Sequence, residues 1–197
     1  MSENAKKMKK QILHLRDALS TELQQQYSST IAEQVLAMDL FKRAETVFVY
    51  VDFRSEVQTR SLIRTMFKLG KKVVVPVTML RERDLVPVQI SNLESDLCPG
   101  YASILEPVES IRSSNYVSPE TIDVIILPGS VFDKKGGRMG YGGGFYDRFV
   151  SLKAPQAHRL GLCYELQVVP EAPLQDHDER MDTIITEKRI IQSSRES

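Results

Sequence analysis

The chain has 197 residues, of which 42% are hydrophobic, enough for one folded domain with a substantial core. Its 26 basic and 26 acidic residues cancel, which disfavours a general nucleic-acid binder, because such a protein needs a basic excess against the phosphate backbone. The sequence contains no apolar run long enough to span a membrane, and its polar N-terminus is unlike a secretory signal.

The two cysteines, Cys98 and Cys163, lie far apart, and neither belongs to a Cys-x-x-Cys pair. This usage is typical of reduced, buried thiols in an intracellular protein. We therefore expect a cytoplasmic protein without nucleic-acid or membrane partners, and we expect it to be a monomer.

The predicted elements begin with two amphipathic helices, one over residues 5–19 and one from Thr21 to about Leu40. Met8, Ile12, Leu15 and Leu19 share one face of the first helix. Ser20 and Thr21 offer a cap for the second helix, and Gln24 fits a capping box with Thr21. Further helices are predicted over residues 56–70 and from Phe145. Short apolar runs predict strands, separated by a polar, turn-rich middle, at residues 46–51, 72–77, 123–128, 158–164 and 182–187.

This alternation of strands and helices predicts βαβ units and a mainly parallel sheet with helices on both faces, which is a three-layer α/β fold. We expect residues 1–197 to form one domain. The N-terminal helical pair, residues 1–40, lacks strand partners of its own and is expected to pack on the side of the α/β core.

The stretch "GGRMGYGGGFYDR", residues 136–148, holds six of the ten glycines and follows the predicted strand "DVIILP". Glycine amides can approach an anion closely, and the helix predicted after them adds positive potential at its N-terminus. Arg138 can grip phosphate oxygens, and Asp147 suits Mg²⁺. The alternative is a flexible surface loop. The sequence does not match the Walker phosphate loop, which needs Lys and then Ser or Thr after its last glycine, where this chain has Phe145 and Tyr146. It does not match the dinucleotide-binding pattern either, which needs glycine at position 145.

The longer stretch "PGSVFDKKGGRMGYGGGFYDR" resembles the signature of the 5-formyltetrahydrofolate cyclo-ligase family, with Met139 in place of a Leu and Phe145 in place of a Tyr. Other segments match in order: "KKQILHLRDALS", "SEVQT", "ASILEP" and "DHDERMDTIITE". The resemblance spans almost the whole chain, and its glycine signature is highly specific.

The resemblance implies an enzyme that uses ATP and Mg²⁺ to close 5-formyltetrahydrofolate to 5,10-methenyltetrahydrofolate, through a phosphorylated formyl intermediate. It implies catalytic roles for Arg138 and Tyr141, and Mg²⁺ ligation by Asp147 and Asp182. The implied ATP contacts are Lys6, Lys9, Lys10, Arg138, Met139, Gly140, Tyr141, Gly142, Gly143, Gly144, Phe145 and Tyr146. The implied folate contacts are Val51, Glu56, Tyr141, Gly142, Gly143, Gly144 and Phe145.

The residues by themselves leave simpler interpretations open. The N-terminal lysines could form a solvated helix end. In the family pattern a Lys is followed four residues later by an Arg. Here Ala5, next to Lys6, stands at the position of that Lys, and Lys9 stands at the position of that Arg. Glu56 could be a carboxylate at a helix N-terminus, where its charge interacts favourably with the helix dipole. The segment "HDERMD" could be a solvated, charged loop. His177, His14 and His158 are not expected to bind metal. The alternative function is a phosphometabolite sensor without catalysis, which would not need the pair of aspartates.

Overall fold

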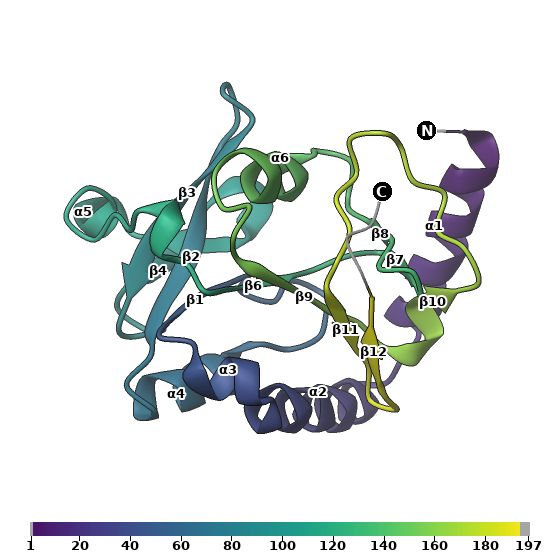
Figure 1. The fold of residues 1–197 in the computed structure, drawn as a ribbon, viewed down its shortest axis with the longest axis horizontal. Helices are drawn as coiled ribbons and strands as arrows, with labels where there is room; N and C mark the ends of the chain where they lie inside the picture. Colours follow the sequence, from purple (N-terminus) through teal and green to yellow (C-terminus); the bar gives the residue numbers. More distant parts are fainter. Residues whose placement is uncertain (1, 194–197) are drawn as a thin grey trace.

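A seven-stranded sheet crosses the molecule in the computed structural model, which describes residues 2–193 (Figure 1). Its order is β12-β11-β9-β6-β1-β2-β3; the inner neighbours are parallel, and β3 and β12 are antiparallel at the two edges. This arrangement confirms the predicted α/β class. The strands are β1 Thr46–Val49, β2 Lys72–Met79, β3 Asp84–Ile90, β6 Val124–Leu127, β9 His158–Leu162, β11 Thr183–Ile185 and β12 Ile190–Gln192.

Helices cover both faces of this sheet (Figure 1). One face packs against α2 (Thr21–Ala37), α3 (Asp39–Arg43) and α4 (Arg60–Lys68), and the other against α6 (Phe145–Leu152). Side chains that alternate along β1 serve the two cores: Val47 and Val49 face α2–α4, whereas Phe48 stacks on Phe149 of α6 at 4.8 Å between ring centres. Both faces are therefore buried, which explains the uninterrupted apolar runs of the inner strands.

The two N-terminal helices both pack on the core, but on different parts of it. Helix α1 (Glu3–Asp17) covers a small sheet of β7 (Val131–Asp133), β8 (Arg138–Met139) and β10 (Val168–Val169), away from α2 (Figure 1). Met8 and Ile12 of the predicted face pack on this sheet, but Leu15 is 54% exposed, and the fully buried residues of the helix are Ala5 and Arg16. The small sheet carries the start of the glycine loop, so α1 lies beside that loop.

Helix α2 begins at Thr21, as predicted, but its N-terminus is not capped by the predicted capping box. Its N-cap is Ser20, whose hydroxyl accepts the Leu23 N–H at 3.2 Å, and Gln24 turns back to the Leu19 carbonyl at 2.9 Å. The capping box at Thr21 is therefore wrong. The Ser20 hydroxyl, one residue earlier, instead satisfies one free amide of the first turn, that of Leu23.

The turn-rich middle contains more strand than the sequence suggested. "LVPVQI" lies in β3, where Pro87 stands opposite Pro76 of β2 and its carbonyl accepts the Val117 N–H on the outer side. An edge strand tolerates such a proline.

No helix within residues 2–193 is long and apolar enough to cross a membrane. The remaining elements are β4 Leu97–Pro99, β5 Leu105–Pro107, α5 Glu109–Arg112 and the 3₁₀ turns η1 Tyr101–Ser103, η2 Pro119–Thr121 and η3 Glu165–Gln167.

Candidate active site

A cavity of about 420 Å³ opens at the carboxyl ends of the parallel strands. Tyr50 and Val51 follow β1, Thr78 lies near the end of β2, and Pro128 follows β6, and all four line the cavity. This edge is where open α/β sheets bind ligands. The cavity has the size of an ordinary small-molecule site, and its wall is mainly apolar with a few charged groups. Of the predicted site residues, the lining includes Val51, Glu56, Arg138, Gly140, Tyr141, Gly143, Gly144, Phe145, Tyr146 and Asp147.

The glycine loop forms one wall of this cavity, between β8 and α6. Helix α6 begins at Phe145, as predicted, and its N-cap is Gly144 with φ +64°. Gly142 has φ +107°, and a Cβ there would meet nothing within 4 Å. Only glycine adopts such backbone angles without strain, so the sequence suits a loop whose amide groups face a ligand beside a helix N-terminus.

Arg138 and Asp147 form an ion pair inside the cavity wall. Arg138 Nη2 donates to Asp147 Oδ1 at 2.6 Å, Nη1 donates to the Pro128 carbonyl at 3.1 Å, and Nε has no partner among the described residues. Asp147 Oδ1 also accepts the Glu179 N–H at 3.2 Å. Asp147 therefore has a structural role that the sequence did not predict, as the partner of a buried arginine.

Glu56 also lines the cavity. It lies in a loop and not in the predicted helix, because α4 begins only at Arg60. Its Oε2 accepts the Phe53 N–H at 3.0 Å, and the Tyr141 hydroxyl interacts with the same carboxylate. Burial raises the pKa of Glu56, and these hydrogen bonds and the nearby Arg16 oppose that shift. The interpretation of Glu56 as a helix-dipole acid is wrong, because this carboxylate instead faces the cavity.

Tyr141 connects the glycine loop to Glu56. Its hydroxyl interacts with the Glu56 carboxylate and accepts a hydrogen bond from Arg16 Nη1 at 2.8 Å. Desolvation and the charge of Glu56 raise the pKa of Tyr141 far above its usual value. The phenol therefore stays protonated at neutral pH and can donate a hydrogen bond, but it cannot serve as a phenolate base.

Arg16 is a buried residue of the site that the sequence did not predict. It is 4% exposed, lines the cavity, and donates to the Ser55 hydroxyl at 3.0 Å and to the Gly129 carbonyl at 3.4 Å as well as to Tyr141. A signal existed in the sequence: Ala5, Lys9 and Arg16 recur at intervals of four and seven residues, which puts them on one helix face.

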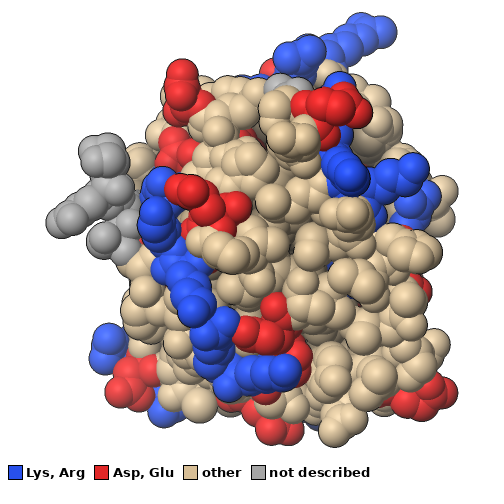
Figure 2. All heavy atoms as spheres, turned by 90° about the vertical axis from the view of Figure 1, so that its right-hand side faces the viewer, with Lys and Arg blue, Asp and Glu red and all other residues tan. Residues whose placement is uncertain are grey.

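The N-terminal lysines differ in where they lie. Lys9 Nζ donates to the Gly140 carbonyl at 2.8 Å, and burial lowers the pKa of Lys9. Lys6 and Lys10 are exposed, and Lys6 pairs with Glu3 at 3.8 Å. Figure 2, which faces the side of the molecule where α1 lies, shows basic side chains interspersed with acidic ones. Of the three lysines, therefore, the structure brings Lys9 to the glycine loop.

The remaining predicted residues lie around the cavity or apart from it. Met139 is 5% exposed and packs with α1 on the small sheet, and Tyr146 contacts Phe48 edge-on at 6.4 Å between ring centres. Asp182 does not line the cavity; its Oδ2 accepts the Arg159 N–H at 2.8 Å, at the start of β9. Within residues 2–193 no group of three or more His, Cys, Asp or Glu side chains has the arrangement of a metal site.

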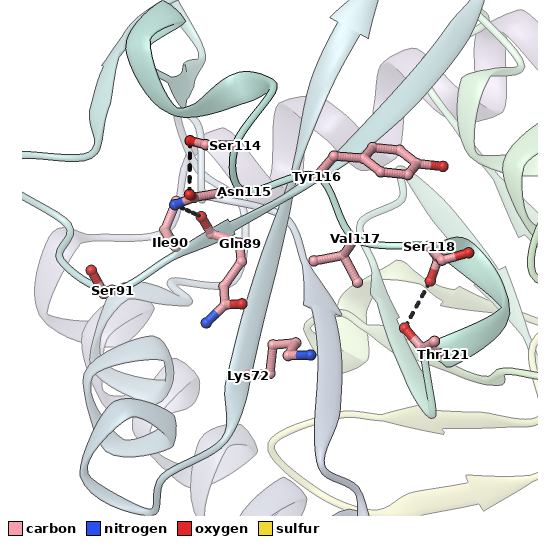
Figure 3. A pocket seen from close by; sticks show the side chains of 10 residues that line it. All are labelled: Lys72, Gln89, Ile90, Ser91, Ser114, Asn115, Tyr116, Val117, Ser118 and Thr121. Carbon is pink, nitrogen blue, oxygen red and sulfur yellow. Dashed lines mark hydrogen bonds between the residues drawn. The ribbon is translucent and has the colours of Figure 1, made fainter.

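A second cavity, of about 370 Å³, lies at the opposite end of the sheet, where β2 begins at Lys72 (Figure 3). Its lining is largely polar, and the Asn115 side chain donates to the Gln89 carbonyl at 3.2 Å (Figure 3). This cavity is away from the carboxyl ends of the strands and from the glycine loop. The first cavity is therefore the candidate active site.

The sequence model of the family described as 5-formyltetrahydrofolate cyclo-ligase matches residues 1–187. The chain belongs to this family. As a cyclo-ligase family member, it is a ligase of folate metabolism.

Curated relatives agree with this assignment over most of their length. The 5-formyltetrahydrofolate cyclo-ligase of Escherichia coli (strain K12) is 30% identical over 183 residues, which cover 89% of this chain and 96% of the relative. The enzyme of the same name from Mus musculus is 28% identical over 176 residues, or 86% of this chain and 87% of the relative.

Solved structures share the fold. An NMR structure of Aquifex aeolicus 5,10-methenyltetrahydrofolate synthetase matches with a TM-score of 0.83 and 27% identity, and it covers 98% of this chain and 95% of its own. A methenyltetrahydrofolate synthetase from Mycoplasma pneumoniae, at 21% identity, has a TM-score of 0.73 over 93% of this chain and 98% of its own, which shows likeness of fold.

Proposed function

We propose that the chain converts 5-formyltetrahydrofolate to 5,10-methenyltetrahydrofolate with consumption of ATP and release of ADP and phosphate. The observation that carries this proposal is one cavity lined both by the buried Glu56 and by the glycine loop, whose Tyr141 interacts with the Glu56 carboxylate. A phosphometabolite sensor needs the phosphate-binding wall but not the buried carboxylate. The family's name favours the enzyme.

The glycine loop supplies the ATP site in this proposal. The fit rests on the open space at Gly142, the positive φ of Gly142 and Gly144, and the N-terminus of α6 behind them. Arg138 presents its guanidinium to the cavity, and Lys9 lies at the edge of the loop. We keep as ATP contacts the full predicted set of Lys6, Lys9, Lys10, Arg138, Met139, Gly140, Tyr141, Gly142, Gly143, Gly144, Phe145 and Tyr146.

Mg²⁺ is proposed to bind beside the phosphates through Asp147. The carboxylate lines the cavity, and both of its hydrogen bonds to described residues use Oδ1, which leaves Oδ2 for a hard cation. Asp182 fits less well, because it bonds to Arg159 outside the cavity lining, and it stays a proposed second ligand. When bound, Mg²⁺ would neutralise phosphate charge during transfer.

Glu56 is proposed to hold the pterin-like ring of the folate. That ring offers adjacent N–H donors, and a carboxylate accepts two such donors well. Val51 and Phe145 line the same cavity and give apolar contact, with Tyr141 and the loop glycines between folate and ATP. Because Glu56 is 8% exposed, its hydrogen bonds to a ligand would be shielded from water.

The reaction then has two steps. The formyl oxygen attacks the γ-phosphorus of ATP, and the bond from that phosphorus to the ADP oxygen breaks. The folate nitrogen N10 next attacks the formyl carbon, the carbon–oxygen bond breaks to release phosphate, and N10 loses its proton. The chain's residues bind and orient: Arg138 offsets charge on the phosphoryl group, and Tyr141 donates a hydrogen bond from a phenol that stays protonated.

The test is the absorbance of methenyltetrahydrofolate after mixing the protein with 5-formyltetrahydrofolate, with and without ATP and Mg²⁺. We expect product only when all three are present, with one ADP formed per product. A sensor would bind phosphate compounds and form neither. ADP formed without methenyltetrahydrofolate would contradict the coupling of the two steps.

We also propose that residues 1–197 act as one cytoplasmic domain and as a monomer. The free Cys98 and Cys163, of which Cys163 is fully buried, support a reducing compartment. Light scattering after size exclusion measures the mass directly, and a mass near 45 kDa in place of 22.4 kDa would contradict the monomer.

A further inference from the structure

Arg54 occupies a backbone position that does not suit arginine. Residues 53–56 form a turn closed by the Glu56 N–H on the Phe53 carbonyl at 3.3 Å, and Arg54, the second residue of that turn, has φ +54°. Turns with positive φ at this place usually carry Gly, Asn or Asp, because a Cβ clashes with the backbone there. Arginine is therefore kept at a conformational cost, and such a cost often marks a functional position.

The side chain of Arg54 lines the mouth of the candidate active site. The residue is exposed and belongs to the cavity wall, two positions before Glu56. Its guanidinium lies over the Phe53 ring at 5.0 Å, and Phe53 and the half-exposed Tyr101 line the cavity with it. The mouth thus presents aromatic surface and a positive charge side by side.

This charge is not matched by the protein. Among the described residues Arg54 has no ion pair and no hydrogen bond from its side chain. The acidic neighbours in sequence are engaged elsewhere: Asp52 pairs with Arg60, and Glu56 bonds to Phe53 and interacts with Tyr141. A cation held at a cavity mouth without an acidic partner suits an anionic ligand.

We propose that Arg54 binds the carboxylates of the glutamate tail of the folate, with the benzoyl ring of the tail against Phe53 and Tyr101. This inference rests on the proposed function. The folate ring bound at Glu56 must leave its tail pointing outward, because the cavity of about 420 Å³ also serves ATP on the glycine-loop side. Arg54 stands at the mouth close to Glu56 in the chain, and a guanidinium binds carboxylates in a two-pronged manner.

The chain provides a matched control. Arg83 is also an exposed arginine with positive φ, at +52°, but it lies in the turn between β2 and β3 and does not line the cavity. Arg54→Gly and Arg83→Gly should both relieve backbone strain and leave the melting temperature equal or higher. If Arg54 only stabilised the fold, the melting temperature of Arg54→Gly would instead fall below that of the wild type.

The experiment compares 5-formyltetrahydrofolate with 5-formyltetrahydropteroate, which lacks the glutamate, by Michaelis constant and by direct binding at low and high salt. In Arg54→Gly we expect the Michaelis constant for the glutamate form to rise about fivefold or more, with the pteroate form unchanged, as for the loss of one charge-assisted contact at a partly exposed site. The wild-type preference for the glutamate form should shrink at high salt. Arg83→Gly should match the wild type.

Equal Michaelis constants for both substrates in Arg54→Gly and wild type would overturn the tail site while leaving the proposed function intact. Equal weakening of both substrates would overturn it too, because the variant would then act on the ring and not on the tail. A failure of the proposed function looks different: the wild type itself would form no methenyl product from either substrate.

Discussion

Arg138 and Asp147 are nine residues apart and meet as a buried pair, Nη2 to Oδ1 at 2.6 Å, with side chains that are 2% and 9% exposed. In the proposed function both side chains also bind ligands, so this ion pair would contribute both to stability and to the reaction. The two roles can be separated, because removing one partner of such a pair costs about 3–5 kcal/mol, whereas replacing both with apolar groups is often neutral.

The first prediction uses that difference. Arg138→Met should destabilise the protein by about 3–5 kcal/mol and lower turnover about 100-fold or more, as for a transition-state contact worth roughly 3 kcal/mol. Adding Asp147→Leu should restore most of the stability but none of the turnover. The measurements are urea unfolding and methenyltetrahydrofolate formation. Recovery of turnover along with stability would mean that the pair is only structural.

The second prediction concerns pH and Glu56. Burial raises the pKa of this carboxyl above its unfolded value, so its contribution to stability is present at low pH and is lost as pH rises past the unfolded pKa of about 4.5. Relative to Glu56→Gln, the unliganded wild type should therefore lose stability as pH rises from about 4.5 through the raised folded pKa. The variant should bind reduced folate more weakly and ATP unchanged. Thermal melts across pH, with ligand titrations, check both; parallel curves would mean that burial does not shift this group.

The third prediction tests the glycine loop against a matched glycine. Gly142 and Gly70 both have positive φ, and a Cβ at either would meet nothing within 4 Å. Substitution by alanine should cost each about 1–2 kcal/mol of stability, because both positions are left-handed. Only Gly142→Ala should raise the Michaelis constant for ATP, since Gly70 follows α4 at the other end of the sheet. Equal ATP kinetics in the two folded variants would make the loop an ordinary connection.

The fourth prediction separates two neighbouring lysines. Lys9→Met keeps the aliphatic stem but removes the ammonium that bonds to the Gly140 carbonyl. The exposed Lys7→Met is its control, because Lys7 is not among the proposed ATP contacts. We expect the Michaelis constant for ATP to rise about tenfold in the first variant, the effect of one lost charged hydrogen bond, and to stay constant in the second. Initial rates over an ATP series measure this. The same rise in both variants would indicate a diffuse field over the whole helix end.

The sequence predicted the parallel strands and the start of α6 at Phe145, because both follow from local patterns. It did not predict that residues 56–59 stay outside α4. There Asp52 accepts the Thr59 N–H at 3.0 Å and the Thr59 hydroxyl donates to the Tyr50 carbonyl at 2.8 Å, so contacts to the end of β1 replace the first helical turn. Such contacts exist only once the sheet has formed.

The place of Arg16 in the site was not predictable from the sequence for the same reason. On a helix rich in lysine, one arginine is indistinguishable from a solvated charge until its partners are known, and these are Ser55, Gly129 and Tyr141 from three other segments. The site residues within the glycine signature could be found because they are contiguous. Those that depend on distant segments meeting could not.

The bond from Arg16 to Tyr141 spans 125 residues of chain. During synthesis at about 5–20 residues per second, helix α1 therefore leaves the ribosome roughly 6–25 s before its partner on the glycine loop exists. Through that interval Ala5, Met8 and Ile12, which later pack on the small sheet, have no surface to cover them. Until the glycine loop emerges, helix α1 of the nascent chain therefore exposes apolar side chains of the kind that chaperones bind.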